Sequence, residues 1–232
     1  MSGTLYGLGV GPGDPELLTL KAHRLIRSAG VIAYPAPDTG ESFARAIVAE
    51  YMPDGATEIA IVIPMRSERF PAQEVYDSAA TEIAQALEAG QDVVVLCEGD
   101  PFFYGSFMYL FSRLSDRFPT EIVPGVSSLG AVTAAASQPL IAREEVLTVL
   151  PATLEESELE RHLADANAAA IMKLGRHFGK TRAVLDRLGM TERARFVSHA
   201  SLPNQNVCPL SEAPETAPYF SMIIVPGKDA HV

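Results

Sequence analysis

Short apolar runs alternate with segments of helical periodicity along the first half of this sequence, and this alternation constrains the fold more than any other feature. Runs with the length of strands lie at residues 5–10, 31–34, 58–63, 92–97 and 121–123. Segments with helical spacing lie at residues 15–29, 42–51 and 72–89. Continuously apolar strands joined by helices predict a mostly parallel sheet with both faces covered. Ligands of such sheets bind at the carboxyl ends of the strands.

A second set of predicted strands follows the breaks at Pro124-Gly125 and Gln138-Pro139. These strands lie at residues 146–150, 168–174, 194–199 and 220–225. The tail is rich in proline, so turns and loops are expected to join its strands, which can then run antiparallel. We therefore expect two α/β domains, an N-terminal one at residues 1–125 and a C-terminal one at residues 126–232.

Charge and cysteine content exclude several classes of protein. The chain has 29 acidic and 18 basic residues, and its net charge of −11 opposes binding to nucleic acid. The longest uncharged stretch, residues 122–142, contains prolines and glycines and is not a membrane span. Cys97 and Cys208 lack the spacing of a disulfide framework, and no secretory signal is visible at the N-terminus. We expect a cytoplasmic protein with neither a nucleic-acid nor a membrane partner.

Metal and hydrolase chemistry are not predicted either. The five histidines show no close metal-ligand spacing, so no metal site is expected. Ser106, Ser127 and Ser128 lie outside any Gly-x-Ser-x-Gly context, and neither cysteine stands out as an activated nucleophile.

The glycine-dense segment at residues 7–14, GLGVGPGD, lies between a predicted strand and a predicted helix. Glycines there allow a ligand to approach the backbone closely. The segment does not match the dinucleotide-binding fingerprint, because Pro12 occupies the position of the last glycine. A ligand loop is favoured, and a plain tight turn is the alternative.

Two further segments follow predicted strands. Residues 97–105, CEGDPFFYG, place an acid, glycines and aromatic residues at one strand end. There Asp100 can accept hydrogen bonds from a ribose or an amino group, although Gly-Asp-Pro is also an ordinary turn sequence. Residues 124–128, PGVSS, supply hydroxyl groups that either cap a helix at residues 129–136 or contact a ligand.

Residues 175–181, GRHFGKT, look like a phosphate-binding loop but have three residues between the glycines where four are needed. A strand-to-helix turn with exposed basic residues is the favoured interpretation, and a nucleotide-phosphate site is the alternative.

Taken in order, three of these segments resemble the tetrapyrrole methylase family: residues 9–22, GVGPGDPELLTLKA, residues 98–101, EGDP, and residues 123–128, VPGVSS. Residues 34–36, 96–110 and 171–177 are most similar to the members of that family that methylate C20 of precorrin-2. The resemblance covers nearly the whole chain. It implies two α/β domains of the tetrapyrrole methylase fold (class III methyltransferase-like), with S-adenosylmethionine (SAM) in the cleft between them, and a homodimer.

The resemblance also implies which residues contact the cofactor. They are Pro12 in the first loop, Glu98, Gly99, Asp100 and Phe103 in the second, Ser127 and Ser128 in the third, and Leu174 and Ala200 in the second domain. Many relatives carry a glycine in place of Glu98, and methionine and glycine in place of Leu174 and Ala200. These departures affect side-chain roles more than backbone contacts.

The reaction implied is C-methylation of a reduced tetrapyrrole on the route to cobalamin, which leaves S-adenosylhomocysteine as the second product. Asp100 and Tyr104 are possible bases, and no catalytic residue is singled out. A polyanionic substrate must meet locally clustered cations in this acidic chain. Candidates for holding its carboxylates are Arg66, Arg69, Lys173, Arg176 and His177. Alternatives are a sister methylase with another ring carbon or a cobalt-loaded substrate, and a tetrapyrrole- or nucleotide-binding protein without catalysis.

Overall fold

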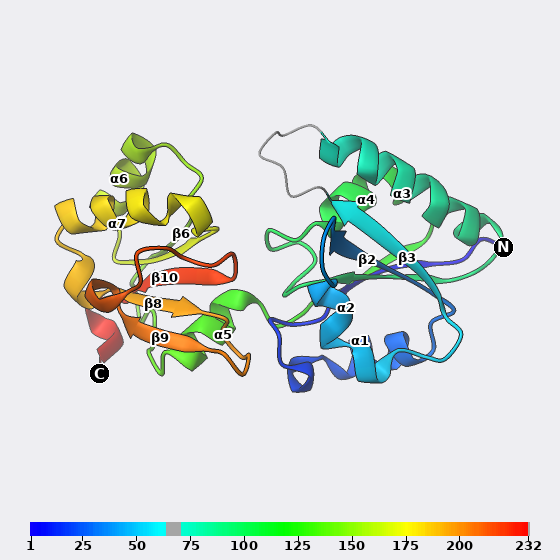
Figure 1. Cartoon of the computed structure of the whole chain (residues 1–232), viewed down its shortest axis with the longest axis horizontal. Coiled ribbons are helices and arrows are strands. Elements are labelled where there is room, and N and C mark those ends of the chain that lie inside the picture. Colours follow the sequence, from blue (N-terminus) through cyan, green and yellow to red (C-terminus); the bar gives the residue numbers. More distant parts are fainter. Residues whose placement is uncertain (64–70, 232) are drawn as a thin grey trace. The chain divides into compact units, whose positions relative to one another are not determined.

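The computed structural model describes residues 1–63 and 71–231. The chain divides into two compact units, Met1–Ser127 and Ser128–Val232. Each unit contains a five-stranded sheet with helices against it (Figure 1). The predicted fold class, two α/β domains, is confirmed. The boundary predicted between residues 125 and 126 stays a prediction, because compactness alone does not show where independent folding ends.

The sheet of unit 1 is fully parallel and has the order β3-β2-β4-β1-β5. Its strands are β1 (Leu5–Gly9), β2 (Val31–Pro37), β3 (Thr57–Ile63), β4 (Val93–Cys97) and β5 (Thr120–Val123). All five were predicted, because each is a short apolar run bounded by turn residues. β1 lies between β4 and β5, so the loops that follow these three strands leave the sheet side by side.

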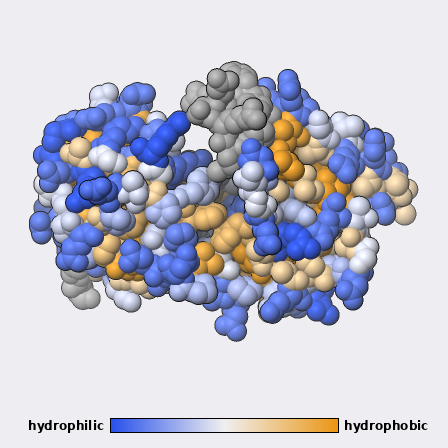
Figure 2. Space-filling model, viewed as in Figure 1, coloured by the Kyte–Doolittle hydropathy of each residue, from blue (hydrophilic) through white to orange (hydrophobic). Residues whose placement is uncertain are grey.

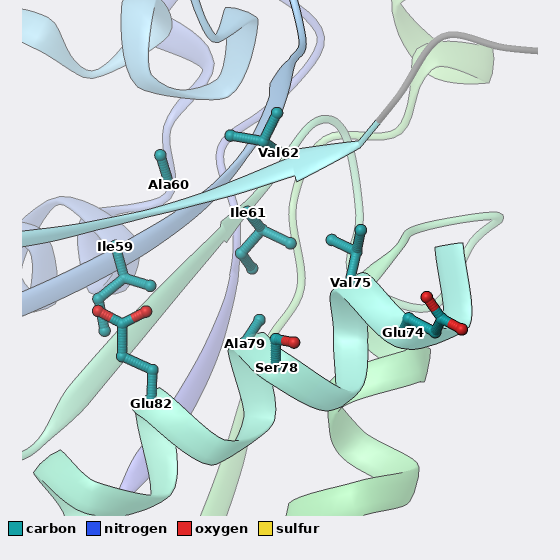
Figure 3. Close-up of a pocket in the computed structure, with 9 residues that line it drawn as sticks. All are labelled: Ile59, Ala60, Ile61, Val62, Glu74, Val75, Ser78, Ala79 and Glu82. Carbon is teal, nitrogen blue, oxygen red and sulfur yellow. The ribbon is translucent and has the colours of Figure 1, made fainter. Parts of the chain in front are cut away.

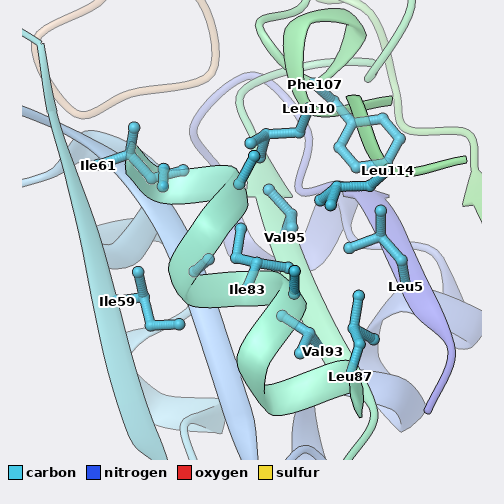
Figure 4. Packing of buried hydrophobic residues seen from close by; sticks show 14 of the residues in the cluster. Leu5, Ile59, Ile61, Ile83, Leu87, Val93, Val95, Phe107, Leu110 and Leu114 are labelled. Carbon is cyan, nitrogen blue, oxygen red and sulfur yellow. The ribbon is translucent and has the colours of Figure 1, made fainter. Parts of the chain in front are cut away.

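Helices cover both faces of this sheet. They are α1 (Leu20–Arg27), α2 (Phe43–Ile47), α3 (Pro71–Glu88) and α4 (Phe107–Leu114), with 3-10 turns at Pro15–Leu17 and Ala49–Tyr51. On one face Ile83, Leu87 and Leu110 of α3 and α4 pack against strand residues such as Val93 (Figure 4). On the other face, α1 and α2 bury side chains such as Ile26 and Ile47. Each such buried side chain contributes about 1.5–3 kcal/mol to folding.

The prediction of one helix over residues 15–29 is wrong. A 3-10 turn at Pro15–Leu17 is capped by Asp14, whose Oδ1 accepts from the Glu16 N–H at 2.8 Å. A separate helix then begins at Leu20, where Thr19 Oγ1 accepts from the Ala22 N–H at 3.1 Å. Asp14 and Thr19 each cap the N-terminus of a separate helical element, so the segment forms a 3-10 turn and a helix in place of one continuous helix. The predicted helix at residues 42–51 is likewise divided, into α2 and the turn at Ala49–Tyr51.

Unit 2 has a mixed sheet with the order β6-β7-β10-β8-β9. Its strands are β6 (Leu147–Pro151), β7 (Ala168–Met172), β8 (Arg195–Ser198), β9 (Asn206–Pro209) and β10 (Ser221–Val225). β6 and β7 are parallel, whereas β10 runs antiparallel to β7 and β8, and β9 runs antiparallel to β8. The expectation of antiparallel strands in the proline-rich tail is confirmed, and β9 was missed.

The helices of unit 2 also lie on both faces of its sheet. They are α5 (Ser128–Ala135), α6 (Glu156–Ala164) and α7 (Phe178–Arg187), with 3-10 turns at Gly175–His177, Thr191–Arg193, Leu210–Glu212 and Asp229–His231. Leu159 of α6 and Val184 of α7 belong to one apolar cluster, and Val132 of α5 belongs to another on the opposite side of the sheet. Hydrophilic residues cover most of the face of each unit shown in Figure 2, with apolar residues scattered among them.

Candidate functional site

The carboxyl ends of β4, β1 and β5 bring three loops of unit 1 to one edge of its sheet. The loops follow Cys97, Gly9 and Val123. Because the three strands are adjacent and parallel, their loops are neighbours although they lie far apart in the sequence. Predicted site residues that this arrangement places at the edge are Pro12, Glu98, Gly99, Asp100, Phe103 and Ser127.

The loops after β1 and β4 are joined through their backbones. The Gly99 N–H donates to the Gly11 carbonyl at 2.7 Å, and the Gly11 N–H donates to the Gly99 carbonyl at 3.3 Å. Both glycines have positive φ, +79° at Gly11 and +64° at Gly99, a conformation that side chains with a Cβ rarely adopt. The glycines singled out in the sequence therefore serve to connect two loops.

Gly9 and Gly125 allow the third loop to reach the other two. A Cβ on Gly9 would lie 2.5 Å from the nitrogen of Gly125 and 2.5 Å from the carbonyl oxygen of Gly99. A Cβ on Gly125 would lie 2.0 Å from that same oxygen. All of these neighbours are backbone atoms, so no side-chain rotation relieves the overlap. The three loops meet backbone to backbone, and only glycine fits where they meet.

Asp100 joins the loops through its side chain. Its Oδ1 accepts from the backbone N–H groups of Phe102 at 2.9 Å and Phe103 at 3.0 Å, and its Oδ2 accepts from the Gly125 N–H at 3.1 Å. The hydrogen bonds to Phe102 and Phe103 fix the turn after β4, and the one to Gly125 ties that turn to the loop after β5. The contact of Asp100 with a cofactor stays a prediction, and the structure adds a role in holding the loops together.

Glu98 follows β4 directly and is half-buried. Burial raises the pKa of its carboxyl above the usual range, while interactions with its own backbone and with the backbone of Ala44 lower it. Ala44 lies in the first turn of α2. The environment of this acidic side chain therefore includes the backbone of α2, and its contact with a cofactor stays a prediction.

Phe103 and Tyr104 come next in the same loop. Their rings are in edge-to-face contact, with centroids 5.4 Å apart at 83°. Tyr104 is 40% exposed and has a φ of +57°, which is uncommon for a residue other than glycine. Such strained residues concentrate at functional sites. This conformation is compatible with the predicted role of Tyr104 as a base, which stays a hypothesis.

Ser127 is the last residue of unit 1, and Ser128 is the first residue of α5. Both are half-buried. The start of α5 at Ser128 agrees with the helix expected over residues 129–136. Contact of either hydroxyl group with a cofactor stays a prediction.

In unit 2, Leu174 follows β7 and Ala200 follows β8, and these two strands end at the same edge of their sheet. The Leu174 side chain is fully buried in the core. The Leu174 side chain is therefore not available to a ligand, and the backbone contacts expected at Leu174 and Ala200 stay predictions. Three residues here, Lys173, His199 and Ser201, have positive φ values of 58°, 51° and 67°. This edge thus concentrates backbone strain.

Three of the five residues predicted to hold substrate carboxylates lie in the part of the chain that the structure describes. Lys173 and Arg176 are exposed after β7, and the Arg176 Nε lies 3.4 Å from the His177 Nε2. Burial lowers the pKa of His177, and the charges of Lys180 and Arg176 lower it further. Arg66 and Arg69 lie outside the described residues. Residues 175–181 form a 3-10 turn that leads into α7, as the strand-to-helix interpretation predicted.

A groove elsewhere in unit 1 involves none of the predicted site residues. It has a volume of about 430 Å³ and lies between the edge strand β3 and helix α3 (Figure 3). Ile59, Ile61 and Val75 line it, and Glu74 and Glu82 add carboxylates from α3. The predicted site loops do not contribute to this groove.

Neither a metal centre nor a membrane-spanning helix is found among residues 1–63 and 71–231. They contain no group of three or more His, Cys, Asp and Glu side chains arranged to hold a metal ion. None of the helices among them is both long and apolar enough to cross a membrane.

Residues 4–214 match the family model described as Tetrapyrrole (Corrin/Porphyrin) Methylases. The chain belongs to the tetrapyrrole methylase family. This confirms the resemblance drawn from the glycine loop, the EGDP segment and the VPGVSS segment. In this structure the same three segments form the joined loops of unit 1.

Two curated relatives place the chain within the tetrapyrrole methylase family. It is 45% identical over 234 residues to cobalamin biosynthesis protein CobIJ of Mycobacterium tuberculosis, in an alignment that covers 97% of this chain and 46% of that protein. The chain thus spans about half the length of this relative. It is 40% identical over 234 residues to a precorrin-2 C(20)-methyltransferase of a Sinorhizobium species, with 97% of this chain and 96% of the relative covered.

A solved structure shares the fold. It is uroporphyrin-III C-methyl transferase from Thermus thermophilus, complexed with S-adenyl homocysteine. The TM-score is 0.71 at 26% identity, and the match covers 97% of this chain and 98% of that one.

Proposed function

We propose that this tetrapyrrole methylase is a SAM-dependent C-methyltransferase that converts precorrin-2 into precorrin-3A by methylation at C20, in cobalamin biosynthesis. The observation that carries the proposal is the set of three joined loops at the carboxyl ends of β4, β1 and β5. They are built from the segments that carry the family resemblance. The 40% identity to a full-length relative named for this reaction supports the choice of substrate.

The polar groups of the loops fit SAM. The cofactor carries a net positive charge, which carboxylates attract. Its ammonium group and ribose hydroxyl groups donate hydrogen bonds, which carboxylates accept. Asp14, Glu98 and Asp100 supply carboxylates at this edge. The solved relative from Thermus thermophilus was obtained with S-adenyl homocysteine, the demethylated form of SAM. We propose the contacts Pro12, Glu98, Gly99, Asp100, Phe103, Ser127 and Ser128, with backbone contacts at Leu174 and Ala200.

When bound, SAM supplies an electrophilic methyl group on a sulfonium. The S–CH₃ bond would break as the bond to C20 forms, the sulfur would keep the electron pair to give S-adenosylhomocysteine, and the proton on C20 would pass to solvent water. No protein nucleophile is required. The chain's own contribution is to orient the two reactants, and orientation of this kind lowers a barrier by up to about 7–11 kcal/mol. Joined loops suit this task, because glycine contacts and the Asp100 carboxylate restrict their movement.

Anaerobic incubation of the purified protein with methyl-labelled SAM and precorrin-2, followed by mass and NMR analysis, tests the proposal. We expect one labelled methyl group at C20. A methyl group at another carbon, or turnover of the cobalt-loaded substrate alone, would replace this proposal by a sister methylase. Tetrapyrrole binding without turnover would indicate a carrier. Stabilisation by ATP with no SAM binding would indicate a nucleotide-binding protein.

We also propose that the protein acts in the cytoplasm as a homodimer. Family resemblance supports the dimer, and Cys97 and Cys208 are free thiols, as expected in a reducing compartment. Sedimentation equilibrium at micromolar concentration tests the assembly, and a monomer mass would contradict it.

A further inference from the structure

Two adjacent aromatic residues, Tyr219 and Phe220, are exposed in unit 2 immediately before β10. Tyr219 is 68% exposed and Phe220 is 36% exposed. Their rings are in edge-to-face contact, with centroids 5.1 Å apart at 81°. Adjacent exposed aromatic rings of this kind are enriched where proteins bind ligands or partners. The proposed cofactor contacts include neither residue.

The strand order places this pair at the edge of its sheet where β7 and β8 end. β10 runs antiparallel to β7 and β8, so the residues before β10 lie where β7 and β8 end. The Phe220 carbonyl accepts a hydrogen bond from the His199 N–H at 2.8 Å, which puts Phe220 beside the loop that holds Ala200. Ser221 pairs with Ser198 and Met222 pairs with Met172, the residue before Lys173.

Local hydrogen bonds hold the pair in place. The Ser221 hydroxyl donates to the Pro218 carbonyl at 2.6 Å, and the Ser221 N–H donates to the Tyr219 carbonyl at 3.0 Å. Together with the bond from His199, they tie the backbone of residues 218–221 to itself and to β8. A contact surface fixed in this way loses little conformational entropy when a ligand binds.

The charge of this edge indicates the chemistry of the ligand. The chain has 29 acidic residues, yet residues 146–154, 168–185, 194–211 and 216–228, which hold every strand of this sheet, contain none. The same edge carries Lys173, Arg176, His177 and His199. Glu155, which follows the loop after β6, is an acid whose charge acts on His177. This local field attracts an anion despite the net charge of −11.

We infer that Tyr219 and Phe220 form an aromatic contact surface for the tetrapyrrole macrocycle, with Lys173 and Arg176 at the same edge for its carboxylates. The inference rests on the proposed function, because it takes the tetrapyrrole as the ligand. A macrocycle with apolar pyrrole rings and carboxylate side chains requires both an aromatic surface and nearby cations. This edge of the sheet supplies both. The edge of unit 1 carries Asp14, Glu98 and Asp100, which repel such a ligand.

The experiment compares the double variant Tyr219→Ala/Phe220→Ala with wild type, using precorrin-2 turnover and equilibrium binding of uroporphyrin III, a stable carboxylated porphyrin. We expect the precorrin-2 KM and the porphyrin Kd to rise about ten-fold, with the SAM Kd unchanged. Tyr219→Phe keeps the ring and should retain most of the affinity. Val146→Ala is the matched control. Val146 is 65% exposed and precedes β6, which is parallel to β7, so it lies at the edge of the sheet opposite to Tyr219 and Phe220.

The outcomes separate this inference from the proposed function. A wild-type enzyme that methylates precorrin-2, with KM and porphyrin Kd unchanged in the double variant, would overturn the inference and leave the function intact. No methylation by wild type, with a raised porphyrin Kd in the variant, would overturn the function and keep the aromatic contact. A raised SAM Kd with unchanged porphyrin Kd would reassign the pair to the adenine of the cofactor. Loss of the dimer alone would reassign it to a subunit interface.

Discussion

The Asp100 carboxylate accepts a hydrogen bond from the backbone N–H of Gly125, 25 residues further along the chain, at 3.1 Å. The other oxygen of the same carboxylate accepts from the N–H groups of Phe102 and Phe103. One side chain thus sets the conformation of the turn after β4 and its distance from the loop after β5. Asp100 is a positioning residue for the loops in which the proposed cofactor contacts lie.

Replacement of Asp100 by Asn should loosen these loops. An Asn amide has one acceptor oxygen instead of two, so the N–H groups of the turn or that of Gly125 lose their partner, at a cost of about 1–3 kcal/mol. We expect the SAM Kd, measured by calorimetry, to rise about ten-fold, with a lower Tm.

Asp92→Asn is the matched control for Asp100→Asn. The Asp92 Oδ1 accepts from the Thr4 N–H at 2.7 Å, a similar bond at the opposite ends of β4 and β1. The control variant should lose stability without losing SAM affinity. Equal SAM affinity in the two variants would show that Asp100 has no special role at the site.

Gly9→Ala should disrupt the meeting of the three loops. The added Cβ overlaps backbone atoms of Gly99 and Gly125, and relief requires a shift of the backbone that costs about 1–3 kcal/mol. Denaturant unfolding should show this loss, together with weaker SAM binding. Gly179→Ala, in α7 where nothing lies within 4 Å of the new Cβ, should be neutral or stabilising. Similar destabilisation in both variants would contradict the close packing at Gly9.

The strands other than β9, and the site loops, were predictable because their signals are local. Each strand of unit 1 is a short apolar run, and each proposed site loop begins where such a run ends. Helix α4 was missed, because its sequence is dense in aromatic residues and follows directly on the motif at residues 97–105. Its buried residues, Phe107, Leu110 and Leu114, do have helical spacing. The sequence therefore does contain the periodic signal for this helix.

Contacts between loops were not predictable in the same way. The sequence places Asp100 at a strand end, but nothing in it indicates that the carboxylate turns toward the backbone of Gly125. That direction depends on the strand order, in which β1 separates β4 from β5. The exposure of Tyr219 and Phe220 at the edge shared by β7 and β8 likewise depends on β10 being antiparallel to both.

Acidification should remove a stabilising interaction at Glu58. Its carboxylate accepts from Arg45 Nε at 2.6 Å, Arg45 Nη2 at 2.8 Å and the Tyr34 hydroxyl at 2.6 Å. The bond from Arg45 contributes most to lowering the pKa of Glu58 to about 2. Because the pKa is lowered on folding, the stabilisation is complete above the unfolded value of about 4.3 and is lost as the pH falls toward 2.

The variant Glu58→Gln tests this pH dependence. At pH 7 it should cost about 1 kcal/mol, a modest value because the ion pair is partly exposed to solvent. The difference in free energy of unfolding between wild type and variant should shrink between pH 4.3 and pH 2. A difference that stays constant over this range would show that the charge of Glu58 contributes nothing to stability.

Removal of the cations at the edge of unit 2 should weaken substrate binding in a salt-dependent manner. Lys173 and Arg176 are exposed, so each of Lys173→Ala and Arg176→Ala should raise the precorrin-2 KM by about three-fold at low salt, with the SAM Kd unchanged. Ionic strength screens exposed charges, so the wild-type KM should rise with added salt and the KM of the double variant should rise less. Steady-state kinetics from low to high salt measures both effects.

Arg187→Ala provides the control for charge alone. Arg187 is also exposed, but it pairs with Glu156 and Glu160 of α6 and lies at the end of α7, away from the strand ends. Its removal changes the net charge by the same amount as either edge variant. An equal rise in KM for Arg187→Ala would mean that the overall field of the protein governs substrate affinity. A rise confined to Lys173→Ala and Arg176→Ala would mean that the local cations at the acid-free edge govern it.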